Sequence, residues 1–384
     1  MAKAKQSRKR ADLRRKHAKQ LKKLAKAQAR LANASRKLQE LDAALARRAQ
    51  LDHVTRDQSA AGDIPLRQAL LIFNPRAKGV QKLGNSLDRI LGCLHTYGIS
   101  ATVGIKTSGK AARAFARQAV EQRYDLLIVA AGDGTIEDVA GELVGSDTAL
   151  GILPLGTMNN IARSLGVPLE LEPACALLGV GATRRVDLGR VRAPGSPDDA
   201  FFLESAGVGL SALAVPLGQD GEKGYWGRLV RHLGAALVHQ AADVDVTCDD
   251  GAPVLVHTQV ITVSNAPLFG KNMLIQPDAR MDDGLLDVAL YDGMSKRELE
   301  QHFVAIADSR RVFDARVGHW RARRVRITSA LPLPANADLK VLEERPAWEF
   351  EVLPGALTVA VGQGMALAVP LGLPEQAQPA LASS

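Results

Sequence analysis

The residues best suited to chemistry follow an apolar run at 126–131. Gly132, Asp133, Gly134 and Thr135 come directly after this run and before an amphipathic stretch. Glycines at alternate positions let the backbone turn sharply and approach a ligand closely. A helix that begins there would direct unpaired N–H groups at an anion. The segment therefore predicts a phosphate-binding turn, although tight strand-to-helix turns in other α/β proteins have similar sequences.

Two further segments have the character of ligand-binding turns. Residues 153–163, LPLGTMNNIAR, combine a strand end, a glycine turn and a helix start. Residues 70–79, LLIFNPRAKG, end a strand at Asn74 and continue with basic residues that could bind polyphosphate. Turns that follow neighbouring strands line the edge of an open α/β sheet, where ligands usually bind. Taken alone, the Asn-Pro pair is ordinary turn chemistry.

A run of acidic residues lies at 278–287 and contains Asp278, Asp282, Asp283 and Asp287. Ligand sets made only of oxygen atoms suit magnesium. A solvated acidic surface would have the same composition, so the run by itself leaves both interpretations open.

The elements that must position these residues follow two patterns. From residue 66, apolar runs alternate with amphipathic stretches, which predicts an α/β domain with a mostly parallel sheet. Its expected strands are 69–73, 102–105, 126–130 and 149–153, and its expected helices are 83–95, 110–122, 136–144 and 159–165. After residue 187, period-2 runs predict a mainly antiparallel domain with helices at 226–240 and 296–310. The expected strands there are 201–205, 244–248, 255–263, 285–290, 325–328, 339–342 and 348–353.

The basic charge is concentrated at the N-terminus. Residues 1–58 hold 18 Lys and Arg against 5 Asp and Glu, whereas the whole chain of 384 residues has a formal charge of +8. This segment lacks Gly and Pro, so we expect a helical tail. Leucines at 24, 31, 38 and 45 fit a short coiled-coil seam, which makes a homodimer possible. The cations suit an anionic membrane or nucleic acid, or they simply solvate the helix.

Composition also bounds the location of the protein. No apolar run approaches the roughly 18 residues that span a bilayer, and the N-terminus has no secretory apolar region. Cys93, Cys175 and Cys248 lie far apart and show no CxxC spacing. We expect a cytoplasmic protein whose membrane contact is peripheral.

Five segments, taken together, resemble one family. They are NPxAxG, GDGT, PLGTxNxxAR, FLESAGVG and PDARMDDGLLDV. Their order and spacing are similar to those of the soluble bacterial diacylglycerol kinases, a family that also includes sphingosine and ceramide kinases. The resemblance covers 66–369. It implies an α/β plus β fold, in which a nucleotide-binding domain with a parallel sheet is joined to a β-sandwich-like domain.

The resemblance and the composition together suggest a division of the chain. The expected parts are a basic helical tail at 1–58, a linker at 59–65, an ATP-binding catalytic domain at 66–187, a β-rich lipid-binding domain at 188–350, a closing segment at 351–370 that returns to the first domain, and a disordered tail at 371–384.

The resemblance also assigns site residues. The implied ATP contacts are Asn74, Thr107, Gly132, Asp133, Gly134, Thr135 and Thr157. Asp133 is expected, in addition, to orient magnesium or the acceptor hydroxyl. An ion site in the acidic run would use Asp283 together with Arg280 and Leu285.

The general base implied by the resemblance is the Glu of an Asp-Gly-Glu turn near the C-terminus. Residues 341–345 stand for this turn, with Glu344 as the candidate base and Glu343 as its rival. The Asp and Gly of the turn are missing. Met158 and Asn160 likewise replace Gly and Asp in PLGTGND, so a carboxylate is absent at position 160.

The function implied is an ATP- and Mg²⁺-dependent kinase that phosphorylates a hydroxyl of diacylglycerol or a related lipid. One alternative is a catalytically weak lipid- or nucleotide-binding protein on the same scaffold. Another is an enzyme similar to NAD kinases, which the PLGT helix and the DDGLLDV run disfavour. The expected partners are the lipid substrate and an anionic membrane surface, and nucleic acid is the least favoured.

Overall fold

A long mixed β-sheet runs through the protein, as a computed structural model describes it for residues 67–83, 86–212, 239–269, 273–307 and 313–361. The expected basic tail, the linker, most of the helix at 226–240 and the C-terminal tail lie outside these residues. In the part of the chain that is described, no helix is long and apolar enough to cross a membrane.

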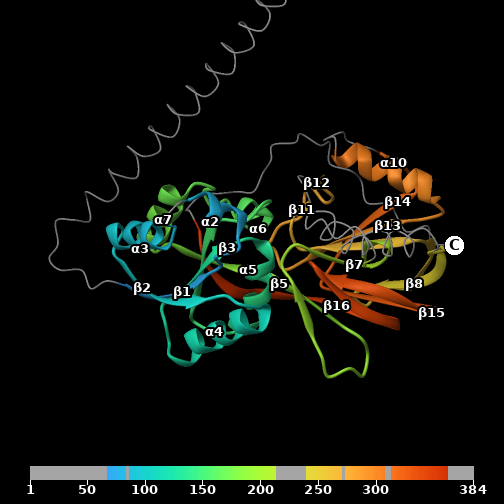
Figure 1. Ribbon diagram of the computed structural model, residues 1–384. Coiled ribbons are helices and arrows are strands. Elements are labelled where there is room, and N and C mark those ends of the chain that lie inside the picture. The colour runs from blue at the N-terminus through green and yellow to red at the C-terminus, as the bar shows by residue number, and fades with distance from the viewer. Residues whose placement is uncertain (1–66, 84–85, 213–238, 270–272, 308–312, 362–384) are drawn as a thin grey trace, which may run out of the picture. The chain divides into compact units, whose positions relative to one another are not determined.

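The first part of the sheet is parallel, in the order β2-β1-β3-β4. Its strands are β1 Arg67–Phe73, β2 Ile99–Ile105, β3 Leu126–Ala131 and β4 Ala149–Pro154. The helices around it are α2 Lys78–Lys82, α3 Ser86–Thr96, α4 Gly109–Glu121, α5 Asp133–Ala140, the 3-10 turn η1 Gly141–Leu143, α6 Asn160–Ser164 and α7 Leu171–Val180. Figure 1 shows α3 and α7 on one side of this sheet and α4 on the other.

Burial explains why these segments form a covered parallel sheet. Every residue of β3 and β4 is buried, as expected for strands with helices on both faces. Ser108 caps the start of helix α4, since its hydroxyl accepts the Ala111 N–H at 3.1 Å. The buried face of α4 consists of alanines, which lets the helix approach the sheet closely.

The second part of the sheet is antiparallel. Its strands are β5 Thr183–Arg192, β6 Ala200–Phe202, β7 Ser205–Gly209, β8 Ala242–Cys248, β9 Val254–Thr258, β10 Val260–Ser264, β13 Leu286–Tyr291, β14 Val317–Ala322, β15 Arg324–Ala337 and β16 Lys340–Ala360. A separate pair consists of β11 Leu268–Phe269 and β12 Met273–Leu274. The expected single strand at 255–263 is wrong, because the chain leaves extended pairing at Gln259, whose carbonyl accepts the Leu210 N–H at 2.8 Å.

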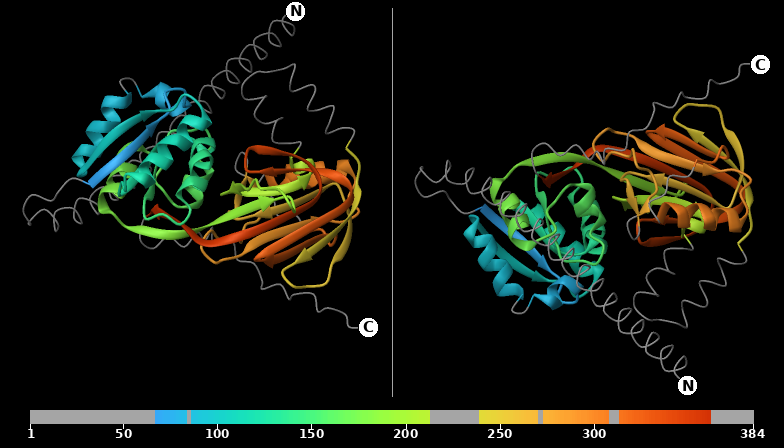
Figure 2. Two further views of the ribbon diagram at one scale, coloured as in Figure 1. Left: turned by 90° about the horizontal axis from the view of Figure 1, so that it is seen from below. Right: turned by 90° about the horizontal axis from the view of Figure 1, so that it is seen from above.

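Two long strands connect the two parts of the sheet. β16 pairs antiparallel with β15 and β5, and Val359 near its end pairs parallel with Leu150 of β4. Figure 2 shows β5 and β16 running from the helix-covered sheet into the antiparallel strands. The predicted fold class, an α/β part followed by a β-sandwich-like part, is confirmed.

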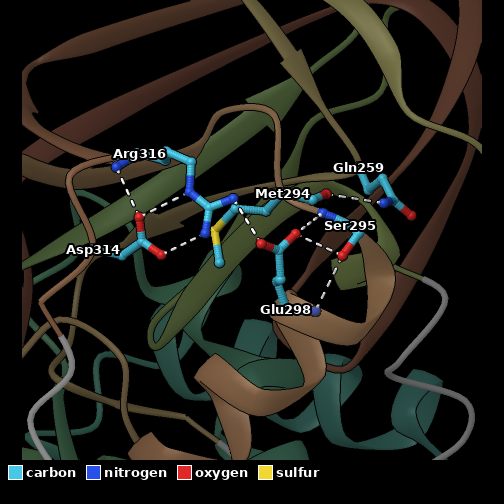
Figure 3. Close-up of polar contacts among 6 residues, drawn as sticks. All are labelled: Gln259, Met294, Ser295, Glu298, Asp314 and Arg316. Atoms are coloured by element: carbon cyan, nitrogen blue, oxygen red, sulfur yellow. Dashed lines mark hydrogen bonds and ion pairs between the residues drawn. The ribbon is translucent and has the colours of Figure 1, made fainter.

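Helix α10, Lys296–Ala307, lies against the antiparallel strands and has a capped N-terminus (Figure 1). The Glu298 carboxylate accepts both the Ser295 N–H at 2.9 Å and the Ser295 hydroxyl at 2.6 Å. Arg316 bridges Glu298 at 2.9 Å and Asp314 at 2.8 Å (Figure 3). This capping box satisfies donors that a helix start would otherwise leave unpaired.

Candidate functional site

Two glycine turns touch at the edge of the parallel sheet where β3 and β4 end. A Cβ on Gly132 would lie 2.8 Å from the Gly156 Cα, and a Cβ on Gly156 would lie 2.4 Å from the Gly132 Cα. Side chains therefore cannot fit at either position without moving backbone. Asn159 fixes the second turn, since its Oδ1 accepts the Gly156 N–H at 2.8 Å. The result is an edge made of backbone at the start of α5, as an anion site requires.

The turn after β1 packs against the same edge. The Gly79 N–H donates to the Leu155 carbonyl at 2.9 Å, and a Cβ on Gly79 would lie 2.7 Å from that oxygen. Asn74 donates its N–H to the Ala130 carbonyl at 3.3 Å, and its Oδ1 accepts the Arg76 N–H at 3.0 Å. The structure thus brings Asn74 beside the turn that contains Gly132, Asp133, Gly134 and Thr135.

Lys106 supplies a cation beside this turn. Its Nζ donates to the Thr135 hydroxyl at 2.9 Å and to the Asp138 carboxylate at 2.8 Å. Thr107, the next residue, is exposed, and so is Thr157 in the second glycine turn. Lys106 was not predicted as a site residue, because a single lysine after a strand has no distinctive local pattern.

The hairpin between β15 and β16 reaches the same edge through its tip. Asp338 adopts a left-handed backbone conformation with φ of 45°, which Asp tolerates better than most residues. Leu339 follows it, and its N–H donates to the Glu137 carboxylate of α5 at 3.4 Å. A Cβ on Gly134 would lie 3.6 Å from the Leu339 Cδ1 atom, so the tip contacts the glycine turn.

Asp338 binds three consecutive backbone N–H groups. Its carboxylate accepts the N–H of Leu203 at 2.6 Å, of Glu204 at 2.8 Å and of Ser205 at 2.9 Å. Both Asp338 and Glu204 are almost fully buried. Asp338 therefore fixes the backbone that carries the Glu204 carboxylate. Neither residue was predicted, because their interaction joins positions more than 130 residues apart.

Glu204 lies beside position 160, where the sequence lacks the expected carboxylate. The Asn160 side-chain amide donates to Glu204 Oε2 at 3.2 Å. Asp133 binds the start of α6, where its Oδ1 accepts the Ile161 N–H at 3.1 Å. A carboxylate is thus present next to position 160, but it comes from the segment before β7.

The acidic cluster, defined as Asp133, Glu137, Glu204 and Asp338, has perturbed electrostatics. Burial raises the pKa of all four carboxyl groups, and repulsion from neighbouring carboxylates raises the pKa of Glu137, Glu204 and Asp338 further. The pKa of Asp338 reaches about 7 despite its three N–H bonds. Among the described residues, no Lys or Arg forms an ion pair with any of the four. Such a group can bind a cation or exchange a proton near neutral pH.

Glu344 lies away from this cluster. The segment 341–345, expected to form a turn, is part of β16, and the turn occurs earlier, at Asp338 and Leu339. Glu344 is exposed and four residues beyond Lys340, which corresponds to about 13 Å along a strand. Glu343, its rival, pairs with Arg345 at 2.8 Å. The assignment of Glu344 as the base stays a prediction.

The predicted ion-binding residues lie in the loop before β13. The Leu285 N–H donates to Asp283 Oδ1 at 3.1 Å, and the Arg280 guanidinium binds Asp282 at 3.1 Å. In the described part of the chain, no three His, Cys, Asp or Glu side chains are arranged as metal ligands. The ion site at Arg280, Asp283 and Leu285 therefore also stays a prediction.

Comparisons with known proteins give matches to both parts of the sheet. The family described as "Diacylglycerol kinase catalytic domain" matches residues 68–191, and "YegS C-terminal NAD kinase beta sandwich-like domain" matches residues 225–361. A diacylglycerol kinase of Bacillus subtilis is 25% identical over 280 residues, which cover 71% of this chain and 89% of that protein.

A second relative is more similar over a shorter length. A probable lipid kinase of the YegS-like type from Pseudomonas putida is 30% identical over 229 residues, covering 58% of this chain and 74% of that protein. The crystal structure of a diacylglycerol kinase from Bacillus anthracis has a TM-score of 0.59 at 21% identity, and the match covers 78% of this chain and 99% of that one. At this identity, the structural likeness concerns the fold.

Proposed function

This chain belongs to the bacterial family of diacylglycerol kinases and YegS-like lipid kinases, and from that premise we propose that it transfers the γ-phosphoryl group of Mg²⁺·ATP to a hydroxyl of diacylglycerol or a related lipid. That it is a lipid kinase is the family assignment, which agrees with the sequence motifs. ATP, Mg²⁺ and the acceptor lipid are the proposal.

The contact between Gly132 and Gly156 is the observation that carries the proposal. Phosphate oxygens need close approach to backbone N–H groups, and both turns are closed to side chains. The γ-phosphoryl group would lie near the start of α5, where Lys106 and Thr135 offer a cation and a hydroxyl. The exposed hydroxyls of Thr107 and Thr157 are free of described partners on this edge and suit the outer phosphates and the ribose.

Asp133 is the residue that would hold Mg²⁺ when it arrives with ATP. Mg²⁺ in kinases is bound by one or two carboxylates together with substrate phosphates, so a cage of three protein ligands is not needed. The uncompensated charge of the acidic cluster favours a cation there. When bound, the ion would neutralise charge that develops on the transferred phosphoryl group.

The proton of the lipid hydroxyl would pass to a carboxylate. Two carboxylates at different positions in the structure are candidates for this base. Glu344 is the residue indicated by the family pattern, whereas Glu204 is buried beside Asp133 and has a pKa well above its usual range. A base with a raised pKa is effective near neutral pH. The pH dependence of kcat in Glu204→Gln and Glu344→Gln separates them, since only loss of the base removes the acidic limb of the profile.

The experiment that tests the proposal uses purified full-length protein, labelled ATP, Mg²⁺ and a total lipid extract. Chromatography of the products would identify any labelled lipid, and Asp133→Ala is the matched inactive variant. We expect one labelled lipid class that is absent with the variant. Nucleotide binding without labelled lipid would overturn the proposal in favour of a binding protein.

A separate proposal concerns residues 1–58. Their excess of Lys and Arg suits peripheral binding to anionic lipid, at about 1 kcal/mol per cation near the surface. Sedimentation with anionic vesicles should therefore decrease when residues 1–58 are deleted. Equal sedimentation of both proteins would eliminate this role for the tail.

A further inference from the structure

The loop before β13, residues 278–285, is hydrogen-bonded to β5, one of the two long strands that connect the parts of the sheet, and β5 is bonded there to the other, β16. Asp187 of β5 donates its N–H to the Met281 carbonyl at 2.7 Å. Its carboxylate accepts the N–H of Gly284 at 2.7 Å and of Gly355, in β16, at 2.7 Å. The conformation of this loop therefore sets how β5 and β16 are held together.

Two carboxylates next to this loop share one guanidinium. Arg321 of β14 is directly opposite Asp287 of β13, and its Nε lies 3.4 Å from Asp287 Oδ1. Its Nη2 forms an ion pair with Asp283 Oδ2. The other oxygen of Asp283 accepts the Leu285 N–H at 3.1 Å. Both oxygens of Asp283 are thus engaged by the protein itself.

Two other arginines near the loop bind a third carboxylate, that of Asp282. Arg280 and Arg184 both bind the Asp282 carboxylate, at 3.1 Å and 3.3 Å. Asp287 is only 7% exposed, so its charge needs a compensating cation. Arg321 is the cation that the described residues supply to Asp283 and Asp287.

A divalent ion held by Asp283 and the carbonyls of Arg280 and Leu285 would compete with this guanidinium. Both cations would use the same Asp283 carboxylate, and two cations that close together repel each other. We propose that Arg321 takes the place of that ion, so that the loop is closed in this protein without a bound divalent metal. Mg²⁺ would then be required only with the nucleotide, beside Asp133.

The test measures thermal unfolding of the full-length protein without nucleotide, in EDTA and in millimolar MgCl₂. We expect wild-type Tm to be equal in both, within about 1 °C. Arg321→Met should lower Tm by roughly 3 °C or more in EDTA, and Mg²⁺ should restore much of that loss. Arg324→Met is the matched control, because Arg324 forms an exposed ion pair with Asp250 at 3.5 Å.

Asp283→Asn distinguishes Mg²⁺ binding at this loop from Mg²⁺ binding at the acidic cluster. If Mg²⁺ changes the Tm of wild type and Asp283→Asn equally, the ion binds outside this loop, and that change is subtracted from the Tm change of Arg321→Met. A rise in the wild-type Tm with Mg²⁺ that is absent in Asp283→Asn would overturn the proposal. An Arg321→Met variant whose Tm does not change with Mg²⁺ would overturn it as well. If Arg321→Met does not fold, Mn²⁺ binding measured by electron paramagnetic resonance decides. Equal binding by wild type and Asp283→Asn supports the proposal, and loss of one ion in Asp283→Asn refutes it.

Discussion

Two groups of carboxylates in this protein have opposite surroundings. At the start of α10, Glu298 and Asp314 bond to Ser295 and Arg316, and these bonds lower the pKa of each carboxyl to about 2 (Figure 3). In the acidic cluster, burial raises the pKa of every member, and like charges raise the pKa of Glu137, Glu204 and Asp338 further. Both groups lie beside the N-terminus of a helix, so the helix alone does not explain the difference.

The carboxyl groups at α10 increase the stability of the folded protein at neutral pH, whereas those of the acidic cluster decrease it. The carboxyls at α10 stabilise the folded state above their unfolded pKa, and this contribution is lost as pH falls toward 2. Asp338 behaves in the opposite way, because stability falls as pH rises from about 4 to about 7. An arrangement that costs stability at neutral pH is expected where a ligand or a reaction uses the charge.

The largest effect should come from removing the charge nearest the glycine turns. Asp133→Asn should lower kcat by about 100-fold or more, because a carboxylate that holds Mg²⁺ or orients the hydroxyl is lost. Its Tm should stay equal or rise, since a buried charge is removed. Steady-state kinetics and calorimetry measure both. Asp314→Asn is the control, with normal kcat, and a normal kcat in Asp133→Asn would contradict the distinction.

A second effect concerns the backbone that positions Asp133. Gly156→Ala should destabilise the protein by about 1–3 kcal/mol, because the new Cβ would lie 2.4 Å from the Gly132 Cα. The KM for ATP should rise about tenfold, because the new side chain opens the edge that is proposed to bind phosphate. Gly92→Ala, in α3 with open space around it, should instead stabilise by about 0.5–1 kcal/mol. Equal behaviour of the two variants would show that the glycine contact is unimportant.

A third test relieves repulsion within the acidic cluster. Glu137→Gln keeps an oxygen for the Leu339 N–H but removes one of the buried charges. The free energy of unfolding should exceed that of wild type by about 1 kcal/mol at pH 8, and the gain should shrink as pH falls toward 4. Urea unfolding across this pH range measures it. A gain that is independent of pH would mean that charge is not its cause.

The smallest effect is expected at α10. Ser295→Ala removes the hydroxyl that bonds Glu298 and should destabilise by about 0.5–1 kcal/mol at pH 7, with unchanged kinase activity. This difference should decrease as pH falls from about 4 toward 2, because the contribution of Glu298 is lost between its unfolded pKa and its folded pKa of about 2. Urea unfolding at pH 7 and pH 3 measures the change. A loss of activity would place α10 closer to the site than the comparison assumes.

Much of the parallel sheet was predictable from local pattern. β1, β3 and β4 are short apolar runs, which predict buried strands. Asn74, Gly132 and Gly156 follow these runs, and residues of these types next to a strand end predict a turn. The second part was less predictable. β5 and β14 were missed because their apolar residues are interrupted by arginines that pair with acids on adjacent strands, such as Arg190 with Glu351.

The sequence by itself determined the family, the order of the two parts and the glycine turns at the strand ends, since glycine spacing and strand periodicity act through adjacent residues. Only the tertiary structure decided which carboxylates meet. Asp338 reaches Glu204 across more than 130 residues, and Arg321 reaches Asp283 across 38. Burial and charge pairing depend on contacts between distant segments, so no local pattern could place these residues together.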